Sequence, residues 1–146
     1  WRGQVFASEH DADNLGYLRH NRRQSGLLNV TVIGGRAPAA LAGLPPPRAV
    51  FIGGSGGEMA AILQTIARAA GPGCRVVANL ATLEHLVETR AHMEALGWSP
   101  TLLQVNVARE ARLGGLTRLA PLNPVFVVWG TTVSWRSPTM NENGAS

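Results

Sequence analysis

The chain has 146 residues, 45% of them apolar, so it is long enough for one folded domain with a sizeable core and is not expected to be disordered. Its formal net charge is +4, but all 13 basic residues are arginines, and the one local basic run, at residues 20–23, has no interleaved aromatic residues, so nucleic-acid binding is not predicted. The longest strongly apolar run covers only residues 125–129, far short of the roughly 20 residues that a membrane helix needs.

The first half of the chain predicts three strands and one helix. The strands are short apolar segments at residues 4–8, 30–33 and 49–52. Residues 11–13 can cap a helix that runs to about Ser25 and stops at Gly26. A proline-rich connector at residues 41–47 stands where a further helix would be expected.

The clearest helix is predicted at residues 58–70, because its apolar residues form one stripe at helical spacing. The stripe consists of Met59, Ile62, Leu63, Ile66, Ala67 and Ala70. A strand is predicted at residues 75–80 and a further helix at residues 82–96. The residues of this last helix expected to point inward are Leu83, Leu86 and Val87.

The last two strands are predicted at residues 101–109 and 125–132, separated by a loop at residues 110–124 and no helix, so they should pair antiparallel. The order β-α-β-β-α-β-α-β-β predicts an α/β fold of Rossmann-like type, with a mainly parallel sheet covered on both faces. Among Rossmann-like folds, an antiparallel final strand pair favours the methyltransferase variant. We expect one domain over residues 1–136, followed by a polar tail at residues 137–146.

A glycine-rich turn, Gly53-Gly54-Ser55-Gly56-Gly57, follows one strand and opens the next helix. Open α/β folds bind ligands at this edge of the sheet, and glycine lets a ligand approach the main chain. The turn formally matches G-x-S-x-G, the nucleophile elbow of hydrolases. A hydrolase also needs an acid and a histidine from separate strand ends, but no aspartate follows Asp13, and His85 and His92 share one helix. The spacing does not match G-x-G-x-x-G either, so a plain tight turn stays open as an interpretation.

Glu9 directly follows the first predicted strand, where an acidic residue can hydrogen-bond the ribose of a nucleotide. The same position equally fits an exposed carboxylate that flanks a helix. Gly35, Arg36 and Ala37 follow the next strand at the same sheet edge, where backbone amides can meet an adenine. Glu9, residues 35–37 and the glycine-rich turn are therefore expected to line one crevice.

No metal site is predicted. His85, Glu88 and His92 share one helix face, but three ligands from a single helix rarely make a site, so a solvated face is the preferred interpretation. The single cysteine, Cys74, excludes an internal disulfide and suits a reducing cytoplasm. It lies at a strand start and is interpreted as a small core residue, not a nucleophile.

Several segments together resemble one family. The segments are VFASEHDADNL, NVTVIGGRAPAAL, PRAVFIGGSGG, GCRVVANLATLE and NPVFVVW. They are similar to the methyltransferase domain of the precorrin-6Y C5,15-methyltransferases (decarboxylating) of cobalamin biosynthesis, and to the stand-alone cobalt-precorrin C15-methyltransferases. The resemblance runs from about Gln4 to Trp129, nearly the whole chain.

The resemblance implies a class I S-adenosylmethionine-dependent enzyme that methylates C15 of a precorrin and removes carbon dioxide from the acetate side chain on C12. It implies that Glu9 holds the cofactor ribose and that Gly35, Arg36 and Ala37 lie at the adenine. The residues it implies for the tetrapyrrole side are Gly53, Gly54, Ser55, Gly56, Gly57, Asn79, Thr82 and Glu84. Arg36 and Arg109 are the first candidates to meet the acidic side chains of the substrate. The family also implies a homotetramer and, in the fused aerobic enzymes, an N-terminal tetrapyrrole methylase domain.

The chain departs from the family in one respect. Members of the family begin with a strand and a glycine-rich loop, of the kind D-x-G-x-G-x-G, and this loop wraps the methionine part of the cofactor. The chain starts at Trp1, after that element, so we expect an N-terminally truncated piece that binds the cofactor weakly or not at all. The absent strand would lie next to the strand that carries Glu9 and the strand that ends in the glycine-rich turn. Two alternatives stay open: a methyltransferase fragment for another substrate, and a non-catalytic Rossmann-like binding or assembly domain.

Overall fold

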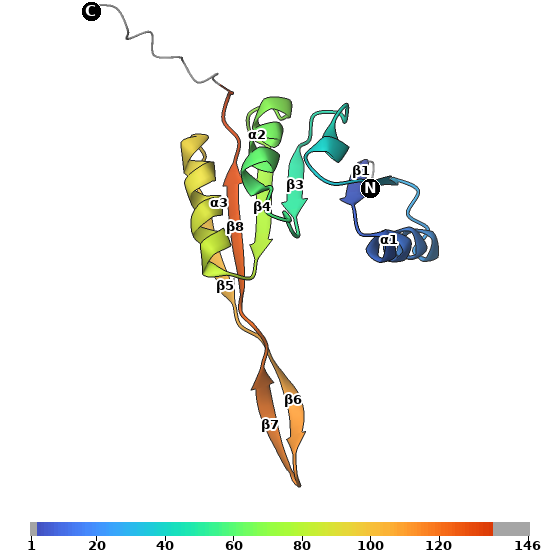
Figure 1. Cartoon of the computed structure of the whole chain (residues 1–146), viewed down its shortest axis with the longest axis vertical. Helices are drawn as coiled ribbons and strands as arrows, with labels where there is room; N and C mark the ends of the chain where they lie inside the picture. The colour runs from blue at the N-terminus through green and yellow to red at the C-terminus, as the bar shows by residue number, and fades with distance from the viewer. Residues whose placement is uncertain (1–2, 136–146) are drawn as a thin grey trace, which may run out of the picture. The chain divides into compact units, whose positions relative to one another are not determined.

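The computed structural model describes residues 3–135, so the predicted polar tail at residues 137–146 lies outside the described residues. The chain forms two compact units. The first consists of the described residues up to Pro45 together with Ser55–Thr65, and the second of Pro46–Gly54 and the described residues from Ile66 onward. Each unit is described separately below (Figure 1).

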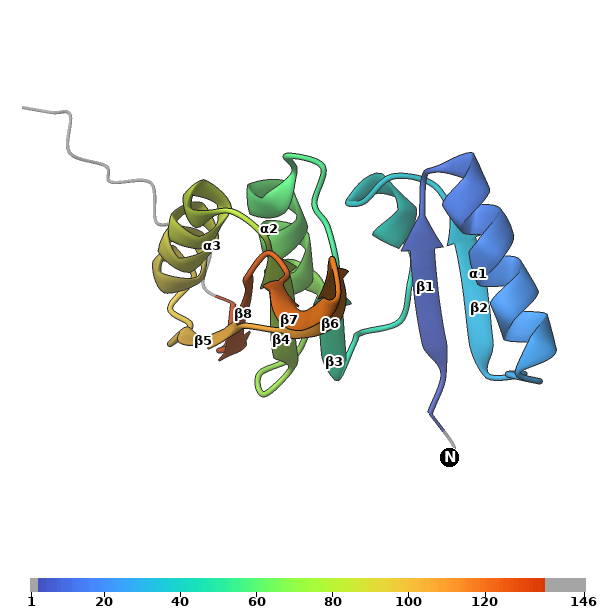
Figure 2. The same ribbon diagram turned by 90° about the horizontal axis from the view of Figure 1, so that it is seen from below.

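The first unit contains a parallel strand pair and one covering helix. Strands β1 (Val5–Glu9) and β2 (Val30–Gly34) pair in register from Val5 with Val30 to Glu9 with Gly34, and helix α1 (Ala12–Gln24) connects them and packs against both (Figure 2). Asp11 caps α1 by accepting a hydrogen bond from Asn14 N at 2.9 Å, which confirms the predicted helix start. A short 3₁₀ turn, η1 (Ala39–Leu41), ends at Leu41, where the predicted connector begins.

The second unit is built on a four-stranded sheet in the order β3-β4-β8-β5. Its strands are β3 (Ala49–Ile52), β4 (Arg75–Leu80), β5 (Thr101–Val105) and β8 (Val125–Thr131). β3 and β4 are parallel, whereas β8 runs antiparallel to both β4 and β5. The predicted antiparallel pairing of the last two strands of the main sheet is therefore confirmed, and β8 also lies between β4 and β5 (Figure 1).

Helix α2 (Met59–Ala69) carries the predicted apolar stripe, and all six of its residues are buried. They are Met59, Ile62, Leu63, Ile66, Ala67 and Ala70. Burial of such a stripe, and not intrinsic helix propensity, is what chiefly stabilises a helix of this length. The periodicity of the sequence therefore identified this helix and its buried face correctly.

The predicted loop at residues 110–124 is wrong. The chain there forms a two-stranded antiparallel hairpin of β6 (Ala108–Leu113) and β7 (Leu116–Pro121), and the strand predicted at residues 101–109 ends at Val105. Gly114, with φ of +60°, and Gly115 form the two-residue connection, where a positive φ favours glycine. Because no residue of either strand is fully buried, the hairpin lacks the alternation of apolar and polar residues that reveals a half-buried strand.

The inward face predicted for helix α3 (Leu83–Ala95) needs correction. Leu86 is buried as predicted, but Leu83 and Val87 are 62% and 67% exposed. The buried face instead combines Leu86 with Thr89 and Met93, at i, i+3 and i+7. The prediction considered apolar residues alone, and it missed this face because a polar threonine lies at its centre.

One edge of β1 and one edge of β3 carry no paired strand among residues 3–135, because β1 pairs only with β2 and β3 only with β4. Val5 on β1 is 48% exposed and Phe51 on β3 is 65% exposed. The backbone N–H and C=O groups of an unpaired edge can pair with a further strand, which would also cover such exposed apolar side chains. The absent strand expected next to both stays a prediction.

Candidate functional site

The carboxylate of Glu9 is held at the carboxyl end of β1 by the backbone that follows it. Glu9 Oε1 accepts hydrogen bonds from His10 N at 2.7 Å and from Asp11 N at 2.8 Å, and lies 3.3 Å from His10 Nδ1. Oε2 has no hydrogen-bond donor among the described residues. These contacts fix the orientation of the carboxylate at the start of α1 and leave one oxygen for a ligand.

Gly35 lies at the same edge as Glu9, because its N–H donates to Glu9 O at 2.9 Å just beyond the last paired residues of β1 and β2. Its φ is +149°, in the region that favours glycine, and a Cβ there would approach Ala40 Cβ to 3.2 Å. Ala37 follows two residues later, before η1. The structure thus brings Glu9 and Gly35 together as expected, whereas their ligand roles stay predictions.

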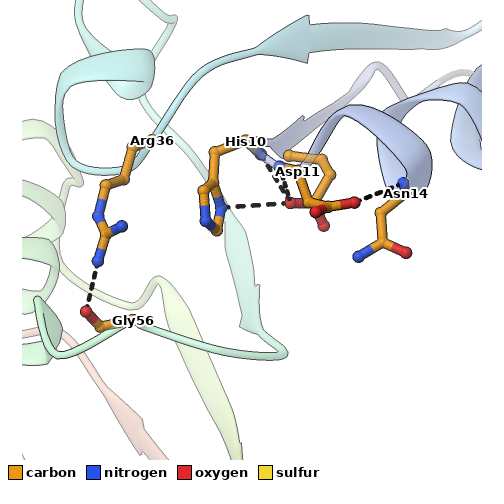
Figure 3. Close-up of polar contacts among 6 residues, drawn as sticks. His10, Asp11, Asn14, Arg36 and Gly56 are labelled. Carbon is orange, nitrogen blue, oxygen red and sulfur yellow. Dashed lines mark hydrogen bonds and ion pairs between the residues drawn. The ribbon is translucent and has the colours of Figure 1, made fainter.

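Arg36 makes a contact that sequence reasoning missed. Its side-chain Nη2 donates a hydrogen bond to Gly56 O, in the glycine-rich turn 20 residues further along the chain (Figure 3). Gly56 and Gly57 have φ of +56° and +89°. Nothing in the local sequence signals this contact, because it depends on how the segment after β2 and the turn before α2 meet in space.

The other three residues of the glycine-rich turn differ in their surroundings. Gly53 and Gly54 belong to the second unit and directly follow β3, and a Cβ at Gly53 would lie 3.5 Å from the ring of Phe51. Ser55 O accepts a hydrogen bond from Glu58 N at 3.0 Å, which closes the turn that leads into α2. The turn is therefore shaped by its own backbone and by Arg36.

Asn79, Thr82 and Glu84 come together where β4 leads into α3. Asn79 lies on β4 opposite Val127 of β8 and is half-buried, and Glu84 is exposed in the first turn of α3. Thr82 is the N-cap of α3, with Oγ1 accepting from His85 N at 3.3 Å. Thr82 therefore already has a structural role, which sequence reasoning did not assign to it.

Arg109 does not lie at this connection. It is an exposed residue of β6, paired with Ala120 of β7 in the separate two-stranded sheet. The structure therefore places it apart from the β4–α3 residues within the second unit.

The remaining candidates are the face of α3 that carries histidines and a glutamate, and the single cysteine. His92 Nε2 lies 3.6 Å from Glu88 Oε1 on the exposed face of α3, and no group of three potential ligands with metal-site geometry occurs within the described part of the chain. Cys74 is buried, as predicted for a core residue, and burial raises the pKa of its thiol. No helix among residues 3–135 is long and apolar enough to cross a membrane.

A family model described as a precorrin methyltransferase domain matches residues 2–132. The chain belongs to this family. It is 36% identical over 122 residues to the precorrin-6Y C(5,15)-methyltransferase [decarboxylating] of a Sinorhizobium species, covering 84% of this chain and 29% of that protein. It is 34% identical over 126 residues to a probable cobalt-precorrin-6B C(15)-methyltransferase (decarboxylating) of Pyrobaculum aerophilum, covering 86% of this chain and 64% of that protein. The chain thus spans less than two thirds of both curated relatives.

The structure is similar to the crystal structure of the precorrin-6y C5,15-methyltransferase from Geobacter metallireducens, with a TM-score of 0.82 and 32% identity. The likeness covers 89% of this chain and 69% of that one. Solved methyltransferases of lower identity share the fold as well. The fold is that of the class I S-adenosylmethionine-dependent methyltransferases, as the order of strands predicted.

Proposed function

We propose that the chain is part of an enzyme that uses S-adenosylmethionine to methylate C15 of a precorrin and decarboxylates the acetate side chain on C12. The match of residues 2–132 to the precorrin methyltransferase family carries this proposal. The names of the relatives, which include decarboxylating C15-methyltransferases of several organisms, support the reaction. The 29% coverage of the Sinorhizobium protein supports fusion to a further domain in the parent protein.

The residues at the end of β1 fit a nucleoside cofactor. The free oxygen of Glu9 can accept a hydrogen bond from a ribose hydroxyl, while the bonds from His10 N and Asp11 N hold the carboxylate in place. The glycine conformation of Gly35 exposes main chain at the same edge, next to Ala37. When bound, the cofactor supplies an activated methyl group on its sulfonium.

The protein's task in such a transfer is alignment, because the methyl group is already activated. We propose that the glycine-rich turn gives a broad macrocycle an unobstructed floor, and that Asn79, Thr82 and Glu84 contribute on the substrate side. Arg109 stays a separate candidate for the acidic side chains of the substrate, since it lies apart from these residues on the β6–β7 hairpin. Loss of carbon dioxide breaks the bond between the carboxyl carbon and the side-chain methylene. The electron pair that remains enters the conjugated macrocycle, which afterwards takes up a proton.

The deciding experiment incubates the longest natural form of the chain with S-adenosylmethionine and a precorrin substrate and follows the product by mass spectrometry. We expect a product that has gained one methyl group and lost one carbon dioxide. Methyl transfer to nucleic acid or to a small molecule instead would favour the first alternative. Failure to bind S-adenosylmethionine at all would favour a non-catalytic binding or assembly domain.

We further propose that the protein is a cytoplasmic homo-oligomer in which the β6–β7 hairpin contacts a second copy. Three leucines of the hairpin, Leu113, Leu116 and Leu119, are 62%, 74% and 72% exposed. A two-stranded ribbon of this kind is at best marginally stable alone in water, and its unpaired edges are templates for another strand. The lone cysteine supports a reducing compartment.

The sequence of β6 is complementary to itself. If two β6 edges pair antiparallel about Ala111, Glu110 of each copy lies opposite Arg112 of the other, giving two cross-strand pairs of opposite charge. The edge of β7 suits pairing less well, because Pro121 has no N–H to donate. Sedimentation of the purified protein tests the proposal: a monomer at micromolar concentration would contradict it.

A further inference from the structure

We propose that Arg36 is a positioning residue that fixes the conformation of the glycine-rich turn, and not a side chain that flanks the adenine. For its activity readout this inference depends on the function proposed above. The structural part of it depends only on the contact between Arg36 and Gly56.

The guanidinium of Arg36 lies directly against the Cα of Gly56. A Cβ built at Gly56 would lie 2.6 Å from Nη2 and 3.2 Å from Cζ of Arg36, closer than a side chain tolerates unless the arginine moves away. Nη2 of Arg36 also donates a hydrogen bond to the carbonyl oxygen of Gly56. Glycine at position 56 therefore does two things: it allows φ of +56° and it lets the guanidinium reach the main chain.

Gly57 is a natural comparison for Gly56. Its φ of +89° would strain any side chain to a similar degree, yet a Cβ there would meet no atom within 4 Å. The two glycines thus share the backbone requirement and differ in the contact with Arg36. This difference separates the effect of strain from the effect of displacing the arginine.

Arg36 is suited to this role because its own backbone is fixed. Its carbonyl oxygen accepts a hydrogen bond from Ala40 N at 3.0 Å, at the start of η1, and Gly35 before it is tied to Glu9 O. The side chain therefore starts from an ordered segment and reaches the turn. Two successive glycines have unusual conformational freedom, and a hydrogen bond from a charged donor restricts it.

The contact also affects the charge of the turn. With Gly56 O engaged by Arg36, the turn presents a guanidinium beside its backbone, in place of an unpaired carbonyl oxygen. A free carbonyl oxygen repels carboxylates, whereas a guanidinium attracts them. Arg36 should therefore favour a substrate that carries acidic side chains, through the turn that it holds.

Substitution of Arg36 distinguishes the two roles. For the R36Q variant we expect the KM for the tetrapyrrole to rise about tenfold while the dissociation constant for S-adenosylmethionine changes less than twofold. R36K keeps the charge and one donor nitrogen, without the planar fork of the guanidinium, and should recover part of the loss. A residue at the adenine would show the opposite result, with weakened cofactor binding and little change in the KM for the tetrapyrrole. That result would overturn the proposal.

A double-mutant cycle tests the contact itself. G56A alone should lower kcat/KM, but in the R36Q background it should add little, because the arginine that it displaces is already absent. G57A is the matched control: its effect on kcat/KM and that of R36Q should be independent, so that the two factors multiply in the double variant. Equal coupling of both glycines to R36Q, or none for Gly56, would overturn the inference.

A measurement without turnover keeps the structural claim separate from the proposed function. Amide hydrogen exchange at residues 56 and 57 should accelerate in R36Q and recover in part in R36K. If the protein shows no methyl transfer at all, the proposed function fails, while the exchange result still decides whether Arg36 holds the turn. Unchanged exchange in R36Q would refute the positioning role by itself.

Discussion

Cys74 and Thr132 are bound to each other twice, once through the backbone and once through the threonine side chain. Thr132 N donates to Cys74 O at 2.9 Å, and Cys74 N donates to Thr132 Oγ1 at 3.0 Å. The same hydroxyl donates to Gly71 O at 2.7 Å. These bonds join the residue after β8 to the turn before β4, where Thr132 is only 3% exposed.

Replacement of Thr132 by valine should therefore destabilise the second unit. The T132V variant keeps the shape of the side chain but leaves Cys74 N and Gly71 O without their partner, at a cost of about 1–3 kcal/mol in the free energy of unfolding. Urea denaturation followed by tryptophan fluorescence measures the loss. T131V, at the exposed neighbouring position, is the control and should stay within about 0.5 kcal/mol of the wild type. Equal effects at both positions would contradict this account.

Removal of the N-cap should loosen α1 locally. No residue of α1 is fully buried, so packing contributes less to this helix than to α2. We expect D11A to lower the local stability of α1 by about 0.5–2 kcal/mol, seen as faster amide exchange at Asn14 and Leu15. D13A, in the first turn but without a capping bond, should show the smaller effect of a lost charge near the helix N-terminus.

Glu9 offers a test of the cofactor site. In E9Q the side chain keeps an oxygen that can accept from His10 N and Asp11 N, but its second group becomes an amide donor that cannot accept from a ribose hydroxyl. We expect affinity for S-adenosylmethionine, measured by calorimetry on the longest natural form of the chain, to fall at least about tenfold. E94Q, an exposed carboxylate of α3, should leave affinity unchanged. An unaltered dissociation constant in E9Q would remove Glu9 from the site.

The pairing of two β6 edges predicts a charge-reversal pattern. R112E places two negative charges opposite each other in the paired edges and should shift the protein towards monomers in analytical ultracentrifugation. The double variant E110R/R112E restores opposite charges and should restore the oligomer. R109E makes the same substitution at a position that faces Leu113 in this register, so it should have the smaller effect. Dissociation by R109E and R112E alike would indicate a general charge effect and a different interface.

The thiol of Cys74 should make stability depend on alkaline pH. Burial raises its pKa above the ordinary value of 9.0, so the unfolded state releases the thiol proton at lower pH than the folded state does. The stability is therefore fully present below the ordinary pKa and declines as the pH rises through the folded-state value, by at most about 1.4 kcal/mol per pH unit. The free energy of unfolding of C74A should decline less over this range. Parallel pH profiles of the two proteins would show that Cys74 contributes nothing.

Sequence patterns found the elements that have a buried face. The strands at residues 49–52 and 75–80 were predicted with their observed bounds, since each is a largely apolar run with a proline or glycine shortly before it. The hairpin was missed because it has no buried face, and the inward face of α3 was misassigned because Thr89 occupies its centre. A pattern of apolar residues identifies a buried face. The hairpin has no such face, and the buried face of α3 has a polar residue at its centre.

The candidate site was predictable in part. The position of Glu9 and Gly35 at one edge follows from parallel pairing of the strands that precede them, which the alternation of elements indicated. The contact between Arg36 and Gly56 was not predictable, because no rule of local sequence relates residues 20 positions apart. The capping bonds of Asp11 and Thr82 each join residues three positions apart, so both could be predicted from local sequence. Only the cap at Asp11 was predicted.

The position of β8 between β4 and β5 has a consequence for how the protein is made. A ribosome releases β4 and β5 well before β8, so neither can complete its pairing until residues 125–131 have left the exit tunnel. Until then β4 has only β3 beside it, and β5 has no partner in the sheet. The nascent second unit is therefore expected to expose strand edges without a partner until β8 is made, a state in which partly folded chains are prone to aggregate.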